Sequence, residues 1–307
     1  MDLNQSMEKN GTTLSPGPLD EAVLVQRFED AYLRVRPGFS WTFVGTGCFG
    51  IVGNILIVAV FAKMGFSNTI HISYSALAVS DLFCVLASMV YGITVMDVVR
   101  NSFNAQTSYR MSNIFGGLPH VCFARTTALI TAWISLERCL CVKFPTKVRL
   151  MITRTVTKIV LGTIFALGCI PMVFVYAANS SSKGTSGERA TLLVPVWVTA
   201  NHAVAVSQNQ HKLAKENRVT KVVVILAVLF LLCSLPMSVN ILADFIIPEY
   251  SIDGSLRYLH LINGMINVLV TELNSSVNVV VFAVSGHRFR SVLFEILSKG
   301  RCQSKIM

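Results

Sequence analysis

Long runs of apolar residues with almost no charge dominate this sequence. Six such runs have 20 or more residues each, and three of them contain no charged side chain. A helix of roughly 20 apolar residues is long enough to cross the hydrocarbon core of a bilayer. We therefore expect six membrane-spanning helices, at residues 41–62, 70–96, 114–141, 159–178, 222–243 and 258–285.

A seventh run, residues 191–207, is near the lower length limit and contains Pro195, Asn201 and His202. Lys and Arg collect in short cytoplasmic loops. With seven spans and an outer N-terminus, most of the bases lie on the cytoplasmic side; without residues 191–207, the basic stretch 212–221 would move outside. We therefore predict an all-α bundle of seven transmembrane helices whose fifth helix is short or truncated.

Composition agrees with a membrane protein. Hydrophobic residues make up 53% of the 307-residue chain and charged residues 14%, and the mean hydropathy is +0.60. The net charge of +10 is spread over separate loops, so it is better explained by membrane topology than by nucleic-acid binding. No nucleophile-base constellation, phosphate loop or metal-ligand spacing is visible, so we expect neither an enzyme nor a resident cofactor.

The expected organisation has three parts. Residues 1–38 form a polar extracellular N-terminus, residues 39–285 the seven-helix domain at the plasma membrane, and residues 286–307 a cytoplasmic tail. Asn4, Asn10 and Asn179 are glycosylation acceptors on the outer side. In the tail, an amphipathic helix is expected along the inner leaflet, and Cys302 is a candidate for palmitoylation. Its apolar face holds Phe289, Val292, Leu293, Ile296 and Leu297.

Several polar residues lie near the middle of the expected spans. Polar groups are costly in hydrocarbon, so they usually face the bundle interior and find partners there. A carboxylate among hydroxyls and amides suits sodium, or a proton and water, but the same residues could simply hold helices together by hydrogen bonds. Both interpretations stay open for Asn54, Asp81, Thr127, Asn274, Ser275 and Asn278.

Five motifs occur in order along the chain. They are Gly53-Asn54, "LAVSD" (77–81), "ERC" (137–139), "FLLCSLP" (230–236) and "NVVVF" (278–282). In this order they resemble the helix motifs of rhodopsin-like (class A) G-protein-coupled receptors. The stretch "AWISLERCLCVKFPTKV" is also similar to invertebrate, molluscan-type chemosensory or neuropeptide-like receptors.

The resemblance implies a receptor that binds an extracellular ligand and activates a heterotrimeric G protein. It also implies that Glu137 and Glu216 hold Arg138 at rest, although Glu137 and Arg138 could instead be interfacial charges that reach toward water. Pro236 is expected to kink its helix and form a hinge. Phe230 and Phe282 stand at further switch positions of the family.

The resemblance also narrows the ligand. The Schiff-base lysine of retinal receptors is replaced by Glu272, and the aspartate of amine receptors by His120. The outer polar residues offer both signs of charge, which suits a peptide or a small chemosensory molecule, although Arg125 and Glu272 could pair structurally. These candidates are His120, Arg125, Asn240, Asp244, Asn267 and Glu272.

The chain departs from the family pattern at several positions. Ser234 replaces the switch tryptophan, Val279 the seventh-helix proline, Phe282 the tyrosine and Cys139 the aromatic residue of the triplet. A non-signalling, truncated or degenerate receptor that acts as a decoy or partner is therefore an alternative, and a small transporter or channel is a weaker one. The ligand and the G-protein subtype are not encoded in any motif.

Overall fold

The computed structural model describes residues 18–144, 152–181, 213–251 and 253–303. Every regular element within these residues is helical, which confirms the predicted all-α class. The long helices are α1 Pro18–Met64, α2 Thr69–Thr94, α5 Leu118–Lys143, α7 Arg154–Ser181, α8 Leu213–Ile246 and α9 Arg257–Ser285. Four of the six expected runs lie within one long helix; of the other two, residues 70–96 end two residues beyond α2, and residues 114–141 begin in a short π-helix before α5.

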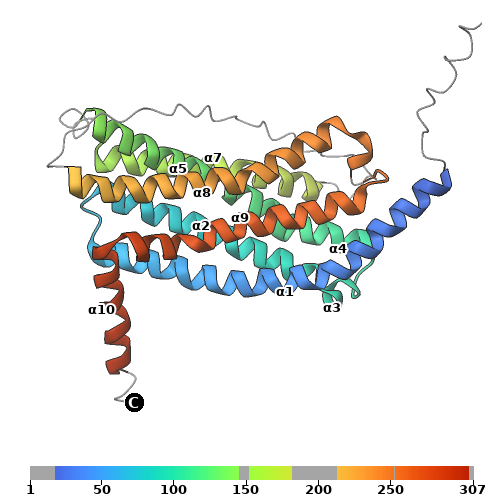
Figure 1. The fold of residues 1–307 in the computed structure, drawn as a ribbon, viewed down its shortest axis with the longest axis horizontal. Helices are drawn as coiled ribbons and strands as arrows, with labels where there is room; N and C mark the ends of the chain where they lie inside the picture. The colour runs from blue at the N-terminus through green and yellow to red at the C-terminus, as the bar shows by residue number, and fades with distance from the viewer. Residues whose placement is uncertain (1–17, 145–151, 182–212, 252, 304–307) are drawn as a thin grey trace, which may run out of the picture.

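The long helices lie side by side in one elongated bundle (Figure 1). Short elements follow α2 and α8 at the end of the bundle opposite α10, and the C-terminal helix leaves the other end. The short elements are α3 Asp97–Arg100, α4 Ala105–Ser112, the π-helix η1 Asn113–Gly117 and the 3-10 helix η2 Pro248–Tyr250; the C-terminal helix is α10 His287–Gln303.

Five helices are long and apolar enough to cross a membrane among the described residues: Ala22–Met64, Thr69–Thr94, Arg154–Ala177, Val222–Ile246 and Arg257–Ser285. α5 has 26 residues, roughly 39 Å at 1.5 Å per residue, so its length also suffices. Its composition is more polar than that of the other five because it carries His120, Arg125, Glu137 and Arg138.

The predicted fifth span, residues 191–207, lies outside the described residues. α7 and α8 nevertheless run in the same direction along the bundle (Figure 1). The end of α7 and the start of α8 are therefore at opposite ends of the bundle, and residues 182–212 have to connect them.

α1 extends well beyond the expected first span. The helix begins at Pro18 and continues without interruption through residue 38, the boundary expected for the polar N-terminus. Tyr258 at the start of α9 donates a hydrogen bond to Glu29 over 2.6 Å, and Arg36 pairs with Asp97 of α3. Hydropathy does not reveal this extension, because an exposed helix outside the membrane can be polar.

The turn between α1 and α2 is set by local chemistry. Gly65 has φ +82°, a left-handed conformation that glycine adopts without strain. Its carbonyl accepts a hydrogen bond from the His71 ring across 2.8 Å. Asn68 then caps α2, because its side chain accepts from the backbone N–H of Ile70. This turn fixes the first residues of α2, which form part of the site below.

α1 and α9 are in close contact because glycines line the α1 side of their interface. A Cβ atom added to Gly50 would lie 2.3 Å from Ser276 Oγ, and one added to Gly53 would lie 2.8 Å from Val279. Without side chains at these positions, the two helix backbones approach closely, as is common between membrane helices.

The apolar core at the end near α10 is aromatic. Phe282 of α9 packs edge-on against Tyr74 at 4.8 Å and against Phe61 at 5.5 Å between ring centroids. Phe289 of α10 stacks on Phe282 at 5.7 Å. α10 is thus attached to the bundle core by an aromatic side chain.

The structure places four of the five residues predicted for the apolar face of α10 against the bundle. Phe289 is buried, and Val292, Leu293 and Ile296 pack against the core, whereas Leu297 is exposed. A salt bridge of 2.7 Å from Lys63 to Glu295 ties α10 to α1. α10 projects crosswise to the bundle (Figure 1).

Candidate functional site

A buried ion pair lies at the end of the bundle near α10. Glu137 and Arg138 occupy the last turns of α5, and Arg138 Nη2 donates to Glu137 Oε1 over 3.1 Å. The glutamate is 1% exposed. An ionised carboxylate at this depth needs several hydrogen-bond donors, because it has lost its contact with water.

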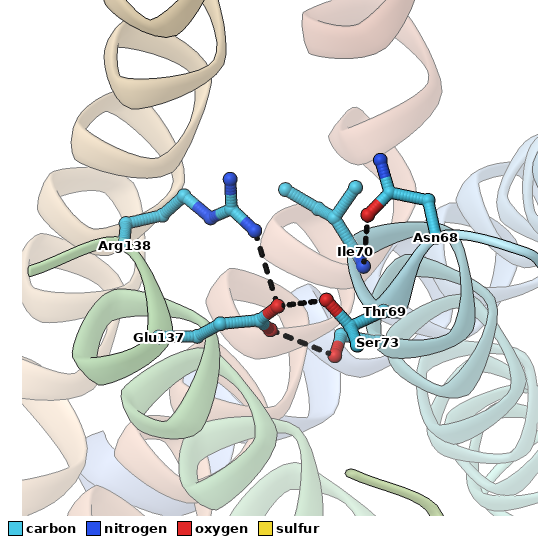
Figure 2. A network of polar contacts seen from close by, with 6 residues as sticks. All are labelled: Asn68, Thr69, Ile70, Ser73, Glu137 and Arg138. Atoms are coloured by element: carbon cyan, nitrogen blue, oxygen red, sulfur yellow. Dashed lines mark hydrogen bonds and ion pairs between the residues drawn. The ribbon is translucent and has the colours of Figure 1, made fainter. Parts of the chain in front are cut away.

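α2 supplies those donors. Figure 2 shows the hydroxyls of Thr69 and Ser73 directed at the two carboxylate oxygens of Glu137. Thr69 donates to Oε1, and Ser73 donates to Oε2 over 3.3 Å. Glu137 therefore accepts three hydrogen bonds, of which only one comes from Arg138.

Arg138 is less completely satisfied than its partner. Its Nε–H is buried and has no hydrogen-bond partner among the described residues. The second expected partner, Glu216, belongs to α8, but its side chain lies outside the described residues. Of the two contacts expected for Arg138, the structure thus shows the ion pair with Glu137.

A second polar cluster surrounds Asp81 of α2 in the middle of the bundle. Thr127 of α5 donates to Asp81 Oδ1 over 2.9 Å, and Asn278 of α9 donates to Oδ2 over 2.6 Å. Asp81 is fully buried. Three helices thus meet at one carboxyl group, and each of its oxygens has a donor.

The other predicted members of this cluster are also buried. Asn54 of α1 donates to the backbone carbonyl of Ser275 over 3.0 Å, which joins α1 to α9 beside the Asp81 cluster. Asn274 is 7% exposed. Ser80, which sequence reasoning missed, lies 2.9 Å from Thr127 Oγ1 and donates to the carbonyl of Phe123.

The sixth-helix candidates lie in α8. Pro236 is inside this helix, so it provides no N–H for the carbonyl of residue 232. Ser234, at the position of the missing tryptophan, donates to the carbonyl of Phe230 over 2.7 Å. Phe230 is half-buried. This side-chain bond does not replace the backbone bond lost at Pro236, because it goes to the carbonyl of Phe230 and not to that of residue 232.

The predicted ligand residues do not share partners. His120 is buried between α5 and α2, 3.2 Å from Ser88 Oγ. Asp244 of α8 lies 3.7 Å from the His260 ring of α9. Asn267 is also buried. His120 and Asp244 thus have different neighbours, and the Asn267 Nδ2 group has no hydrogen-bond partner among the described residues.

Asn240 lies in the last two turns of α8, and its side chain contacts a residue of η2. Tyr250 donates to Asn240 Oδ1 and accepts from Asn263 Nδ2 over 2.6 Å. Burial raises the pKa of the Tyr250 hydroxyl, so it remains a neutral donor. This contact joins the end of α8 to the start of α9 through η2.

Glu272 and Arg125 are not paired. Among the described residues neither makes an ion pair, so the structural pairing considered from the sequence is not observed. Glu272 is fully buried in the middle of α9, and neither of its oxygens accepts a hydrogen bond from a described residue. The nearby Thr46 hydroxyl donates to the carbonyl of Thr42 instead.

The modification candidates fall largely outside the described part. Asn4 and Asn10 lie in residues 1–17, and Asn179 is in the last turn of α7. Cys302 is in α10, but its side chain is not described.

Sequence reasoning found the carboxylates but missed most of their hydroxyl donors. Thr69, Ser73 and Ser80 are separated by four and seven residues, so they lie on one face of α2, toward α5. The spacing of these three hydroxyl residues could have predicted a polar face of α2. By itself it is a weak indication, because hydroxyl residues are common in membrane helices.

Comparison with known families gives one match. Residues 190–300 match the family described as serpentine type 7TM GPCR chemoreceptor Srw. The matched region is less than half of the 307-residue chain and includes α8, α9 and most of α10. No curated protein matches the chain. This region is therefore similar to serpentine G-protein-coupled chemoreceptors.

Proposed function

We propose that this protein is a G-protein-coupled receptor of the plasma membrane that binds a small chemosensory molecule or a peptide from outside. The observation that carries the proposal is the buried pair of Glu137 and Arg138 at one end of the bundle, held by α2. The family similarity over residues 190–300 supports a chemoreceptor.

The mechanism rests on two states of this pair. In the observed state, Glu137 holds Arg138 and α5 is linked to α2. A ligand that prefers an open bundle shifts the population away from this state, and Arg138 then becomes available to a heterotrimeric G protein. The N-terminus is placed outside and the C-terminus inside by the Lys and Arg distribution.

A charge-neutral substitution tests the proposal. Glu137→Gln keeps the size of the side chain but removes the charge that holds Arg138, so basal G-protein activation should rise several-fold in membranes from expressing cells. Glu295→Gln is the matched control, because it removes an acid from an exposed salt bridge at the same end of the bundle. Equal and unchanged activation in both variants, at equal surface expression, would contradict the proposal.

We also propose that Asp81 binds a sodium ion that favours the closed bundle. The carboxylate, with the Thr127 and Ser80 hydroxyls beside it, is a set of hard oxygen ligands that fits such a cation. The alternative is that Thr127 and Asn278 satisfy the carboxylate by themselves. Melting temperatures measured in sodium chloride and in choline chloride distinguish the sodium site from the hydrogen-bond network. Sodium should raise the melting temperature of the wild type but not that of Asp81→Asn. Equal melting temperatures of the wild type in the two salts would favour the hydrogen-bond network.

The decoy interpretation has one specific observation in its favour. Phe282 is buried among aromatic rings and has no hydroxyl with which to bond Arg138. Normal surface expression without G-protein activation in Glu137→Gln would support it over the receptor. The transporter and channel alternatives have no comparable support.

A further inference from the structure

The hydroxyl of Tyr74 has no partner in the observed bundle. Tyr74 is 5% exposed, and its oxygen neither donates nor accepts a hydrogen bond among the described residues. Its ring packs between Phe61 and Phe282 at 5.4 Å and 4.8 Å. A phenylalanine would pack in the same way without burying an unpartnered hydroxyl, so packing alone does not account for a tyrosine at this position.

The ion pair of Glu137 and Arg138 lies at the same end of the bundle as this hydroxyl. The charges of Arg138 and Glu137 both act on the Tyr74 hydroxyl. Tyr74 directly follows Ser73, which donates to Glu137. The Tyr74 hydroxyl is therefore at the same end of the bundle as the ion pair but does not take part in it.

The existing hydrogen bonds of Glu137 and Arg138 indicate which of them is the better partner for the Tyr74 hydroxyl. Glu137 already accepts from Thr69, Ser73 and Arg138. Arg138 has a buried Nε–H without a partner. An acceptor and a donor without partners are thus buried at the same end of the bundle, and the Arg138 side chain would have to move to join them.

The other hydrogen bonds of Glu137 explain why Arg138 can leave it. After its departure the carboxylate keeps two hydroxyl donors from α2, so the buried charge is not left without hydrogen bonds. A guanidinium group that leaves a carboxylate also needs an acceptor, since a buried cation without one is costly. The phenolic oxygen of Tyr74 can accept a hydrogen bond in the open state.

We propose that Tyr74 is a positioning residue for activation: its hydroxyl accepts a hydrogen bond from Arg138 when the arginine leaves Glu137, and so stabilises the open state. This inference deepens the proposed receptor function and rests on it. In this proposal, Tyr74 of α2 provides the hydroxyl that is missing at Phe282 of α9, where the family pattern has a tyrosine.

The test uses Tyr74→Phe in two backgrounds, with basal G-protein activation as the readout. In Glu137→Gln, where Arg138 is released, Tyr74→Phe should remove most of the several-fold rise. In the wild type, where Arg138 remains on Glu137, the same substitution should change activation little. Tyr176→Phe, which removes a hydroxyl bonded to the carbonyl of Ile114 at the opposite end of the bundle, is the control.

Stability gives a second readout that a purely structural role would not reproduce. Tyr74→Phe removes an unpartnered hydroxyl from the closed bundle, so the melting temperature of the wild-type background should stay equal or rise. An undiminished rise of activation in the double variant would overturn the role of Tyr74. A parallel loss of stability and of surface expression would also overturn it, because Tyr74 would then be needed for folding. If Glu137→Gln itself does not raise activation, the receptor proposal fails first.

Discussion

Two buried carboxyl groups in this bundle have opposite hydrogen-bond environments. Asp81 accepts from Thr127 and Asn278, whereas Glu272 accepts from no described residue. Both are fully buried. The stability of the bundle should therefore depend in opposite directions on these two groups, although both are acids in the middle of membrane helices.

Removing a donor from Asp81 should destabilise the bundle. Thr127→Val deletes the hydroxyl that bonds Oδ1 and leaves a buried acceptor incompletely satisfied, at a cost of about 1–3 kcal/mol. Thr131→Val is the matched control, since its hydroxyl bonds only the carbonyl of Thr127 within the same helix. Thermal unfolding in detergent should show a lower melting temperature for Thr127→Val than for Thr131→Val. Equal melting temperatures would mean that the contact with Asp81 contributes nothing.

Glu272 should behave in the opposite way. Glu272→Met replaces an unpartnered carboxyl by an apolar side chain of similar length, so it should raise stability by roughly 1–3 kcal/mol. Asp81→Leu should lower stability, because it leaves Thr127 and Asn278 without their acceptor. The same unfolding assay compares the two variants. A loss of stability in Glu272→Met would show that Glu272 has a partner that the described residues do not include.

At the scale of helices, the interface of α1 and α9 depends on the absence of side chains. A methyl group on Gly50 would meet Ser276 Oγ at 2.3 Å and Val85 at 3.0 Å, whereas one on Gly45 would meet nothing within 4 Å. Both glycines are in the same helix. The interface therefore predicts different outcomes for the same substitution five residues apart.

Gly50→Ala should force α1 and α9 apart and lower the melting temperature, with an expected loss of about 1–3 kcal/mol for an overpacked site. Gly45→Ala should be neutral or slightly stabilising, because alanine has the higher helix propensity. The measurement is the fraction of monodisperse protein after heating. If both variants behave alike, the close contact of these helices is not what stabilises the bundle.

At the scale of the whole molecule, the sequence was sufficient to predict the class of fold and the positions of six long helices. It also predicted that Asp81, Thr127 and Asn278 meet, since three polar residues at the same depth in apolar helices have to face one another. The N-terminal extension of α1 was not predictable from hydropathy, because that segment does not need to be apolar. The pairing of Asp244 with His260 and the burial of His120 depend on helix rotations, which spacing within one helix does not determine.

The proposed function places Arg138 and α10 at the cytoplasmic end of a bundle whose N-terminus is outside. α7 and α8 run in the same direction along that bundle, so the end of α7 and the start of α8 lie at opposite ends of it (Figure 1). The most direct test is antibody access to an N-terminal and a C-terminal tag on intact and permeabilised cells. We expect the N-terminal tag to be stained on intact cells and the C-terminal tag only after permeabilisation. Staining of both tags on intact cells would contradict this orientation.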